Sequence, residues 1–148
     1  MMRLSDESQR EVEEFFRRYT GRQGLVVPPV NVYAGGFAGL LTKVAGGVGA
    51  ITFGRRVFVR PSLVRKDSSG RAEVPAWLLV HEATHVLQYE ERGTLRFLAG
   101  YLRGYFRGLK EGKKFDTAAR TAAYLAIPEE CAAREAERAY VESRRGSV

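Results

Sequence analysis

The residues of this chain best suited to chemistry are its two histidines, which lie four positions apart with an acid between them. The segment His81-Glu82-Ala83-Thr84-His85 is an HExxH motif, and the chain has no third histidine. On a helix, residues four positions apart project from one face, so both imidazoles can bind the same metal ion. Glu82 would lie beside them as a general base for an attacking water. The pattern predicts a zinc site with hydrolytic chemistry.

A catalytic zinc ion needs a third protein ligand, and only carboxylates remain as strong candidates. Hydrolytic sites hold zinc with three side chains and leave one position open. Glu130, at the start of the last predicted helix, is the favoured ligand, and Glu129 and Glu135 are the alternatives. We therefore expect the metal to be bound by His81, His85 and one of these three acids.

The motif also has a simpler interpretation, in which both histidines are satisfied by hydrogen bonds and Glu82 is a solvated helix acid. A five-residue pattern of this kind does occur by chance. Its setting favours the metal, because residues 77–89 form a predicted helix that is apolar around most of its circumference. Imidazoles on a buried helix need partners, and a metal ion supplies them.

The first half of the chain predicts one helix and a small sheet. Ser5 is a good N-cap for an amphipathic helix that ends near Gly21. Residues 26–33 combine branched side chains with two prolines, which favour an extended strand. The glycine-rich residues 35–49 predict a loop or a short irregular helix. Residues 50–60 contain a Gly-Arg turn signal and predict a hairpin.

The second half of the chain is predicted to be helical. The motif helix can begin after Pro75 and has no breaker until Gly93. A second helix covers about 94–109, and Asp116 is a candidate cap for a third that runs to residue 127. Pro128 opens a fourth, which reaches about residue 141. With about three strands, these helices predict a single α+β domain over residues 1–148, with the motif helix at its centre.

The composition is that of a folded protein without disulfides. Its 148 residues are 45% hydrophobic and 28% charged, which argues against disorder. The only cysteine, Cys131, cannot form an internal disulfide. The N-terminus turns polar at once and no segment reaches the length of a membrane span, so we expect a cytoplasmic protein.

Three segments carry a recognisable combination of features. They are the motif helix at 77–89, the hairpin at 50–59, and residues 124–130, which read Tyr-Leu-Ala-Ile-Pro-Glu-Glu. Together they resemble minimal gluzincins, compact zinc metallopeptidase-like proteins related to the thermolysin clan, over about residues 48–140. The resemblance implies a zincin-like fold, Glu130 as a zinc ligand and zinc-dependent peptide-bond hydrolysis with Glu82 as general base. It also implies a peptide or protein substrate along the sheet edge near residues 50–53.

One position departs from the pattern of that family. In thermolysin-like relatives an acid four residues after the ligand glutamate orients a histidine, whereas this chain has Arg134 there. Glu135 and Glu137 are the candidates to replace it. Partners of this kind tune a metal site, so a catalytically weak or inactive zinc-binding module is the first alternative function. Tyr124 is a candidate donor to an oxyanion.

The charge distribution supplies a second alternative, a basic protein that binds nucleic acid or an anionic membrane surface. The net charge is +7 at pH 7, and much of the excess lies within residues 92–114. One face of the predicted second helix carries Arg96, Arg103, Arg107 and Lys110. Aromatic residues interleave with them, as in surfaces that contact nucleic acid or lipid. Because no nucleic-acid motif accompanies this face, we expect it to be solvated.

Overall fold

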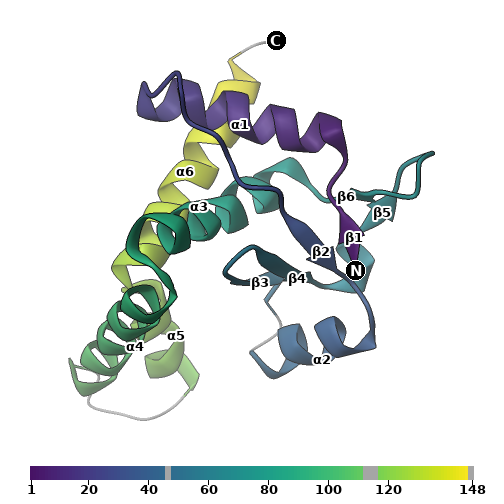
Figure 1. The fold of residues 1–148 in the computed structure, drawn as a ribbon. Coiled ribbons are helices and arrows are strands. Elements are labelled where there is room, and N and C mark those ends of the chain that lie inside the picture. Colours follow the sequence, from purple (N-terminus) through teal and green to yellow (C-terminus); the bar gives the residue numbers. More distant parts are fainter. Residues whose placement is uncertain (46–47, 112–116, 147–148) are drawn as a thin grey trace.

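A small mixed β-sheet lies beside a mainly helical body in the computed structural model, which describes residues 1–45, 48–111 and 117–146 (Figure 1). The strands have the order β1-β2-β4-β3, with β2 and β4 parallel and the other two pairs antiparallel. Their bounds are β1 (Met2–Arg3), β2 (Asn31–Tyr33), β3 (Ala50–Phe53) and β4 (Arg56–Val59). The predicted α+β class and the hairpin at the sheet edge are confirmed.

The sheet differs from the sequence prediction in its short strands. It has four strands rather than about three, because the two-residue strand β1 is too short to produce an alternating pattern. A second ribbon joins β5 (Arg65–Lys66) to β6 (Ala72–Glu73) around the polar residues 67–71, and a 3-10 turn, η1 (Pro61–Leu63), precedes it. This ribbon was not predicted, because its two-residue strands are also too short to produce an alternating pattern.

The first helix, α1 (Asp6–Thr20), has the predicted boundaries. The Ser5 side chain accepts a hydrogen bond from the Ser8 amide, and Gly21 ends the helix with a φ of 69°. Of the predicted strand at 26–33, only β2 is paired in the sheet. The main chain of Val27 instead bonds to two side chains of α1, Gln9 and Glu13, at 2.8 and 3.1 Å.

The remaining helices are α2 (Gly36–Val44), α3 (Ala76–Arg92), α4 (Thr94–Glu111), α5 (Thr117–Leu125) and α6 (Pro128–Arg145). Helix α2 accounts for the glycine-rich segment, although Gly46 and Gly47 lie outside the described residues. So do Asp116, the predicted cap of α5, and Lys114 at the end of the basic region. None of the helices in the described ranges is both long and apolar enough to cross a lipid bilayer.

Helix α3, which carries the HExxH motif, is held by several neighbours. It contacts α6, β3, α4 and α1. Its side chains enter a core shared with α1, the sheet and α6, whose buried members include Val12, Phe16, Val32, Val57, Leu79, Val80, Val86 and Ala136. Trp77, in the first turn, is the one large apolar side chain of α3 that is exposed, at 41%. This packing leaves the motif face of α3 turned towards α4, α6 and β3.

Candidate metal centre

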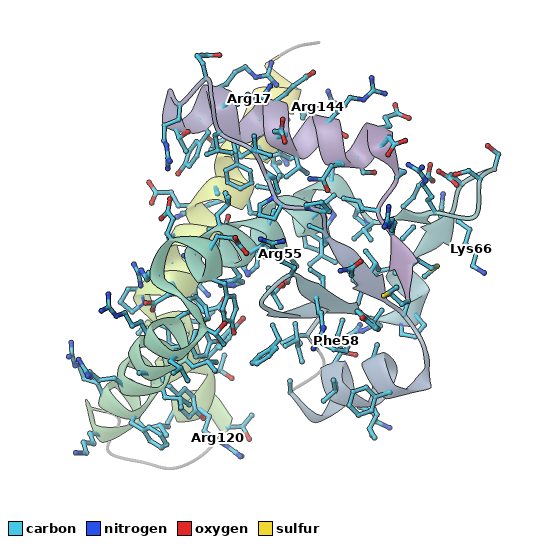
Figure 2. All side chains as sticks on the ribbon, in the orientation of Figure 1. Arg17, Arg55, Phe58, Lys66, Arg120 and Arg144 are labelled. Carbon is cyan, nitrogen blue, oxygen red and sulfur yellow. The ribbon has the colours of Figure 1, made fainter. Side chains whose placement is uncertain are left out.

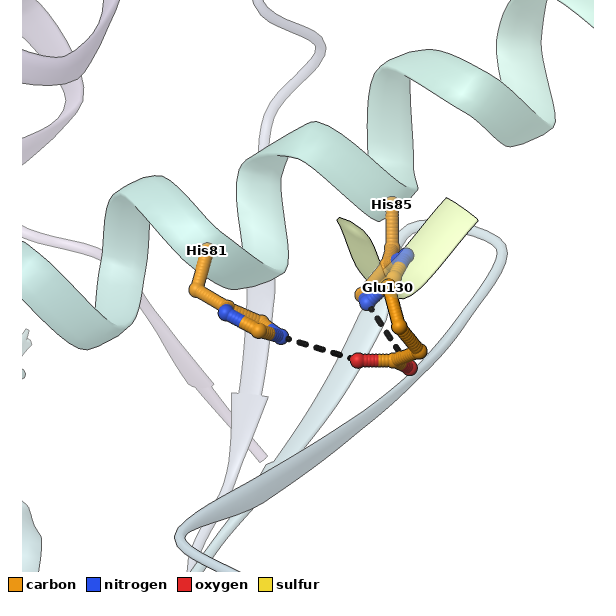
Figure 3. A group of neighbouring side chains, drawn as sticks. All are labelled: His81, His85 and Glu130. Atoms are coloured by element: carbon orange, nitrogen blue, oxygen red, sulfur yellow. Dashed lines mark ion pairs between the residues drawn. The ribbon is translucent and has the colours of Figure 1, made fainter. Parts of the chain in front are cut away.

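Both histidines of the motif point at one carboxylate group. The Nε2 atoms of His81 and His85 lie 3.4 and 3.3 Å from the two carboxylate oxygens of Glu130, which reaches them from α6 (Figure 3). One potential ligand atom from each residue lies within 4.8 Å of the others. Two imidazole nitrogens and a carboxylate oxygen form the donor set of a hydrolytic zinc site.

Glu130 reaches the site because of how α6 begins. Pro128 occupies the first turn of the helix, where its missing N–H costs nothing, and Ile127 before it is fully buried. Gly104 of α4 packs against this turn, where a Cβ would make an ordinary contact of 3.5 Å with the Pro128 ring. The first turn of α6 is thereby fixed against α4, with Glu130 on the side that faces α3.

The other ring nitrogen of each histidine has its own partner. His81 Nδ1 lies 3.0 Å from Oε2 of Glu137, and His85 Nδ1 lies 2.9 Å from Oε1 of Gln88. Gln88 in turn donates to the main-chain oxygen of Glu129 at 3.2 Å. These contacts orient the rings so that both Nε2 atoms face the shared carboxylate.

Arg134 stands where the family has an orienting acid and does not contact a histidine. An acid on the next turn of α6 contacts His81 instead. Arg134 donates to the main-chain oxygen of Leu125, away from the histidines. Glu137, one of the two candidates from the sequence, is the residue that contacts His81, whereas Glu135 is solvent-exposed. Gln88 was not foreseen, although its place three residues after His85 puts it on the same helix face.

The alternative third ligand, Glu129, lies outside the group. Its Oε1 is paired with Arg92, and its Oε2 is buried without a hydrogen-bond partner among the described residues. Adjacent residues on a helix point about 100° apart, so Glu129 reaches Arg92 at the end of α3 while Glu130 reaches the histidines. The structure brings Glu130 to the histidines, and neither Glu129 nor Glu135.

Two tyrosines also hold the Glu130 carboxylate. Tyr101 donates to its Oε1 and Tyr124 to its Oε2, both at 2.8 Å. The sequence suggested Tyr124 as a donor to an oxyanion, but here its hydroxyl bonds to Glu130. Tyr101 was not foreseen as a site residue, because on α4 it resembled part of an aromatic stripe.

Glu82 lies beside this group as a buried acid with one strong hydrogen bond. Its Oε2 accepts from the Thr52 hydroxyl of β3 at 2.7 Å. Burial raises the pKa of Glu82, although the two imidazoles and the Thr52 hydroxyl act in the opposite direction. A carboxylate with a raised pKa beside two imidazoles is well suited to accept and return a proton.

The charges of the three clustered side chains are strongly coupled. Burial disfavours the ionised form of Glu130, yet hydrogen bonds from His81, His85 and Tyr124 hold its pKa well below the usual range. For both imidazoles burial acts against protonation, but the hydrogen bond to Glu130 and the negative charges of Glu130 and Glu82 together outweigh it and raise their pKa. The site therefore keeps a buried carboxylate ionised, as a metal ligand must be.

A cleft of about 360 Å³ opens onto these side chains. Its walls come from β3, α3 and α4, and apart from the polar groups above they are mainly apolar. The apolar lining includes Val48, Ile51, Phe53, Tyr89, Phe97 and Leu98. A cleft of this volume, with a few polar groups that converge on one point, is typical of a small-molecule or peptide site.

No family model, curated protein or solved structure matches this chain.

Proposed function

We propose that this protein is a zinc-dependent peptidase of the gluzincin type, with a zincin-like arrangement of its α+β fold. The observation that carries the proposal is the convergence of His81, His85 and Glu130 within 4.8 Å, beside the buried Glu82. A His, His, Glu donor set with a neighbouring free carboxylate is the combination used in metal-assisted hydrolysis. The resemblance to minimal gluzincins in the sequence supports the same function.

The residues of the group fit a zinc ion. Both imidazoles present Nε2 to one point while Nδ1 is engaged elsewhere, and Glu130 is ionised. His81, His85 and Glu130 would hold the metal. Bound there, zinc would polarise the scissile carbonyl and make water a better nucleophile at neutral pH.

Glu82 would move the proton. Its carboxylate takes a proton from water as the water oxygen attacks the carbonyl carbon, and returns it to the amide nitrogen as the C–N bond breaks. The Thr52 hydroxyl holds one carboxylate oxygen of Glu82 in place. Because Thr52 belongs to β3, the base is oriented by the same strand that lines the cleft.

An extended peptide would lie along β3. This strand is at the edge of the sheet and borders the cleft with all four of its residues, Ala50–Phe53. Addition of a strand to an open sheet edge satisfies the main chain of a peptide without regard to its sequence. The apolar walls favour substrates with hydrophobic side chains near the cleaved bond.

The metal site is tested first by the zinc content of purified protein. Wild type is expected to bind one zinc ion, and His81→Ala and Glu130→Gln are expected to lose it. Glu129→Gln is the matched control, because it makes the same chemical change one residue away, and it should keep the metal. Wild type that carries no zinc after dialysis against the metal, or equal loss in both glutamate variants, would contradict the assignment.

Catalysis is tested separately, with a library of quenched fluorescent peptides. Zinc-loaded wild type should cleave members of the library, and zinc-loaded Glu82→Gln should be slower by about a hundredfold or more, as expected when a general base is lost. If both proteins hold zinc and neither cleaves, the protein is a zinc-binding module without peptidase activity, and the enzyme proposal fails.

A further inference from the structure

Helix α4 presents one face to the protein and a different one to solvent. On the inner face, Phe97 and Tyr101 border the cleft. Gly108 brings the helix close to α5, because a Cβ there would lie only 2.8 Å from the Ala123 Cα, and Gly104 lies against the start of α6. These contacts fix the rotation of α4 about its axis, and hence which residues it turns outward.

The outer face has an apolar stripe that nothing in the described part of the chain covers. Leu95, Leu102 and Phe106 are 83%, 51% and 57% exposed. With Ala99, which is also exposed, they recur at spacings of four, three and four residues, so they form one line along the helix. The expectation of a purely solvated basic face is therefore incomplete, since a hydrophobic stripe of this length is unusual on a surface in contact with water.

A row of positive charges runs beside this stripe. The row consists of Arg96, Arg103, Arg107 and Lys110, all exposed. None of them forms an ion pair with another described residue, and no acidic residue occurs from Thr94 to Lys110. The exposed acids at the end of α3 are paired elsewhere, Glu90 with Arg55 and Glu91 with Arg22.

We propose that this outer face of α4 binds the surface of an anionic lipid bilayer. An interfacial helix buries an apolar face at the boundary of headgroups and acyl chains while its basic residues meet anionic headgroups, and α4 has both parts side by side. The phosphates of a nucleic acid would pair with the arginines. A nucleic acid has no hydrocarbon layer, however, in which the exposed leucines and phenylalanine could be buried. The positive row therefore complements the charge of the membrane, and the stripe complements its interior.

The position of α4 in the molecule allows this contact. Helices α4 and α5 extend away from α1 and from the β5–β6 ribbon, at the far end of the molecule from the N-terminus (Figure 1). Figure 2 shows Arg120 of α5 at the same end, and Leu125 of α5 is another exposed apolar residue. The inner face of α4 still borders the cleft, so docking through the outer face leaves the metal centre accessible.

The test is co-sedimentation of full-length protein with vesicles of phosphatidylcholine, with or without about 30% phosphatidylserine. Wild type should bind the anionic vesicles alone, and binding should weaken as salt is added. Arg103→Glu/Arg107→Glu and Leu102→Ser/Phe106→Ser should each lower the partition coefficient about tenfold or more. Arg65→Glu/Lys66→Glu on β5 is the charge-matched control and should bind like wild type.

Circular dichroism shows whether each variant is folded. Because the altered residues are all exposed, we expect every variant to fold. The proposal fails if wild type does not bind anionic vesicles, or if the Leu102→Ser/Phe106→Ser protein binds them like wild type. It also fails if the protein binds an oligonucleotide through these arginines and does not bind the vesicles. Wild type could instead sediment as a dimer that does not bind vesicles. If the Leu102→Ser/Phe106→Ser protein were then a monomer, the stripe would be assigned to contact with a second copy of the chain.

Discussion

At the scale of single residues, the most telling side chain is Glu130, because four groups hold its two oxygens. Each oxygen faces one imidazole and accepts one phenol hydroxyl. Such partners commonly contribute tenfold to hundredfold to metal affinity. In the proposed metal site the two tyrosines would act through the ligand Glu130 rather than on the metal.

Removal of either hydroxyl should weaken the metal site without unfolding the protein. We expect Tyr101→Phe and Tyr124→Phe each to lower zinc affinity about tenfold, measured by competition with a fluorescent chelator. Tyr105→Phe, on α4 but with no bond to Glu130, is the matched control. Equal affinities for all three variants would show that the hydroxyls do not position the ligand.

The hydroxyl of Thr52 should set the lower end of the pH range for catalysis, if the proposed function holds. Glu82 must be ionised to accept a proton, so activity is present above its pKa and is lost as the pH falls through it. Because the Thr52 hydrogen bond lowers that pKa, Thr52→Val should move the acid limb of the kcat/KM profile to higher pH. Thr52→Ser, which keeps the hydroxyl, should restore it; an unmoved limb in Thr52→Val would contradict the assignment.

At the scale of elements, the close packing of α4 on α5 depends on a single glycine. A Cβ at Gly108 would overlap the Ala123 main chain, whereas one at Gly104 would make ordinary contacts at 3.5 Å and beyond. Gly108→Ala should therefore lower the free energy of unfolding by about 1–3 kcal/mol. Gly104→Ala should raise it by up to about 1 kcal/mol through better helix propensity. Denaturant unfolding measures both, and shifts of the same sign would refute the packing argument.

At the scale of the whole molecule, the proposed metal site joins parts of the chain that are far apart in sequence. Glu130 opens α6, while both histidines lie on α3, and the two helices pack along each other. A ligand that binds only the folded state stabilises it by mass action. Zinc bound at this site should therefore stabilise the entire fold rather than one loop.

We expect zinc at about a hundredfold over its Kd to raise Tm by roughly 5–10 °C, and EDTA to reverse the change. His85→Ala should show the same Tm in EDTA and in zinc, although the loss of a buried ring should lower that Tm below the value of wild type in EDTA. Differential scanning fluorimetry measures all four states. A Tm that is independent of zinc would mean that the group does not bind this metal in the folded protein.

Local patterns in the sequence were sufficient for the long elements. The Ser5 cap, the hairpin around Gly54 and the breaks at Gly93 and Pro128 each place a boundary through interactions within a few residues. The two-residue strands β1, β5 and β6 carry no such pattern, because their pairing depends on residues distant in the chain.

The sequence by itself determined that two imidazoles share one face of a helix, since a spacing of four residues on a helix leaves no alternative. Only the tertiary structure decided which acid joins them, because the choice between Glu129 and Glu130 depends on how α6 is rotated against α3 and α4. It also decided that Tyr101, Thr52 and Gln88 belong to the site and that Leu95, Leu102 and Phe106 face solvent. Periodicity defines the faces of a helix, but packing alone selects the face that is buried.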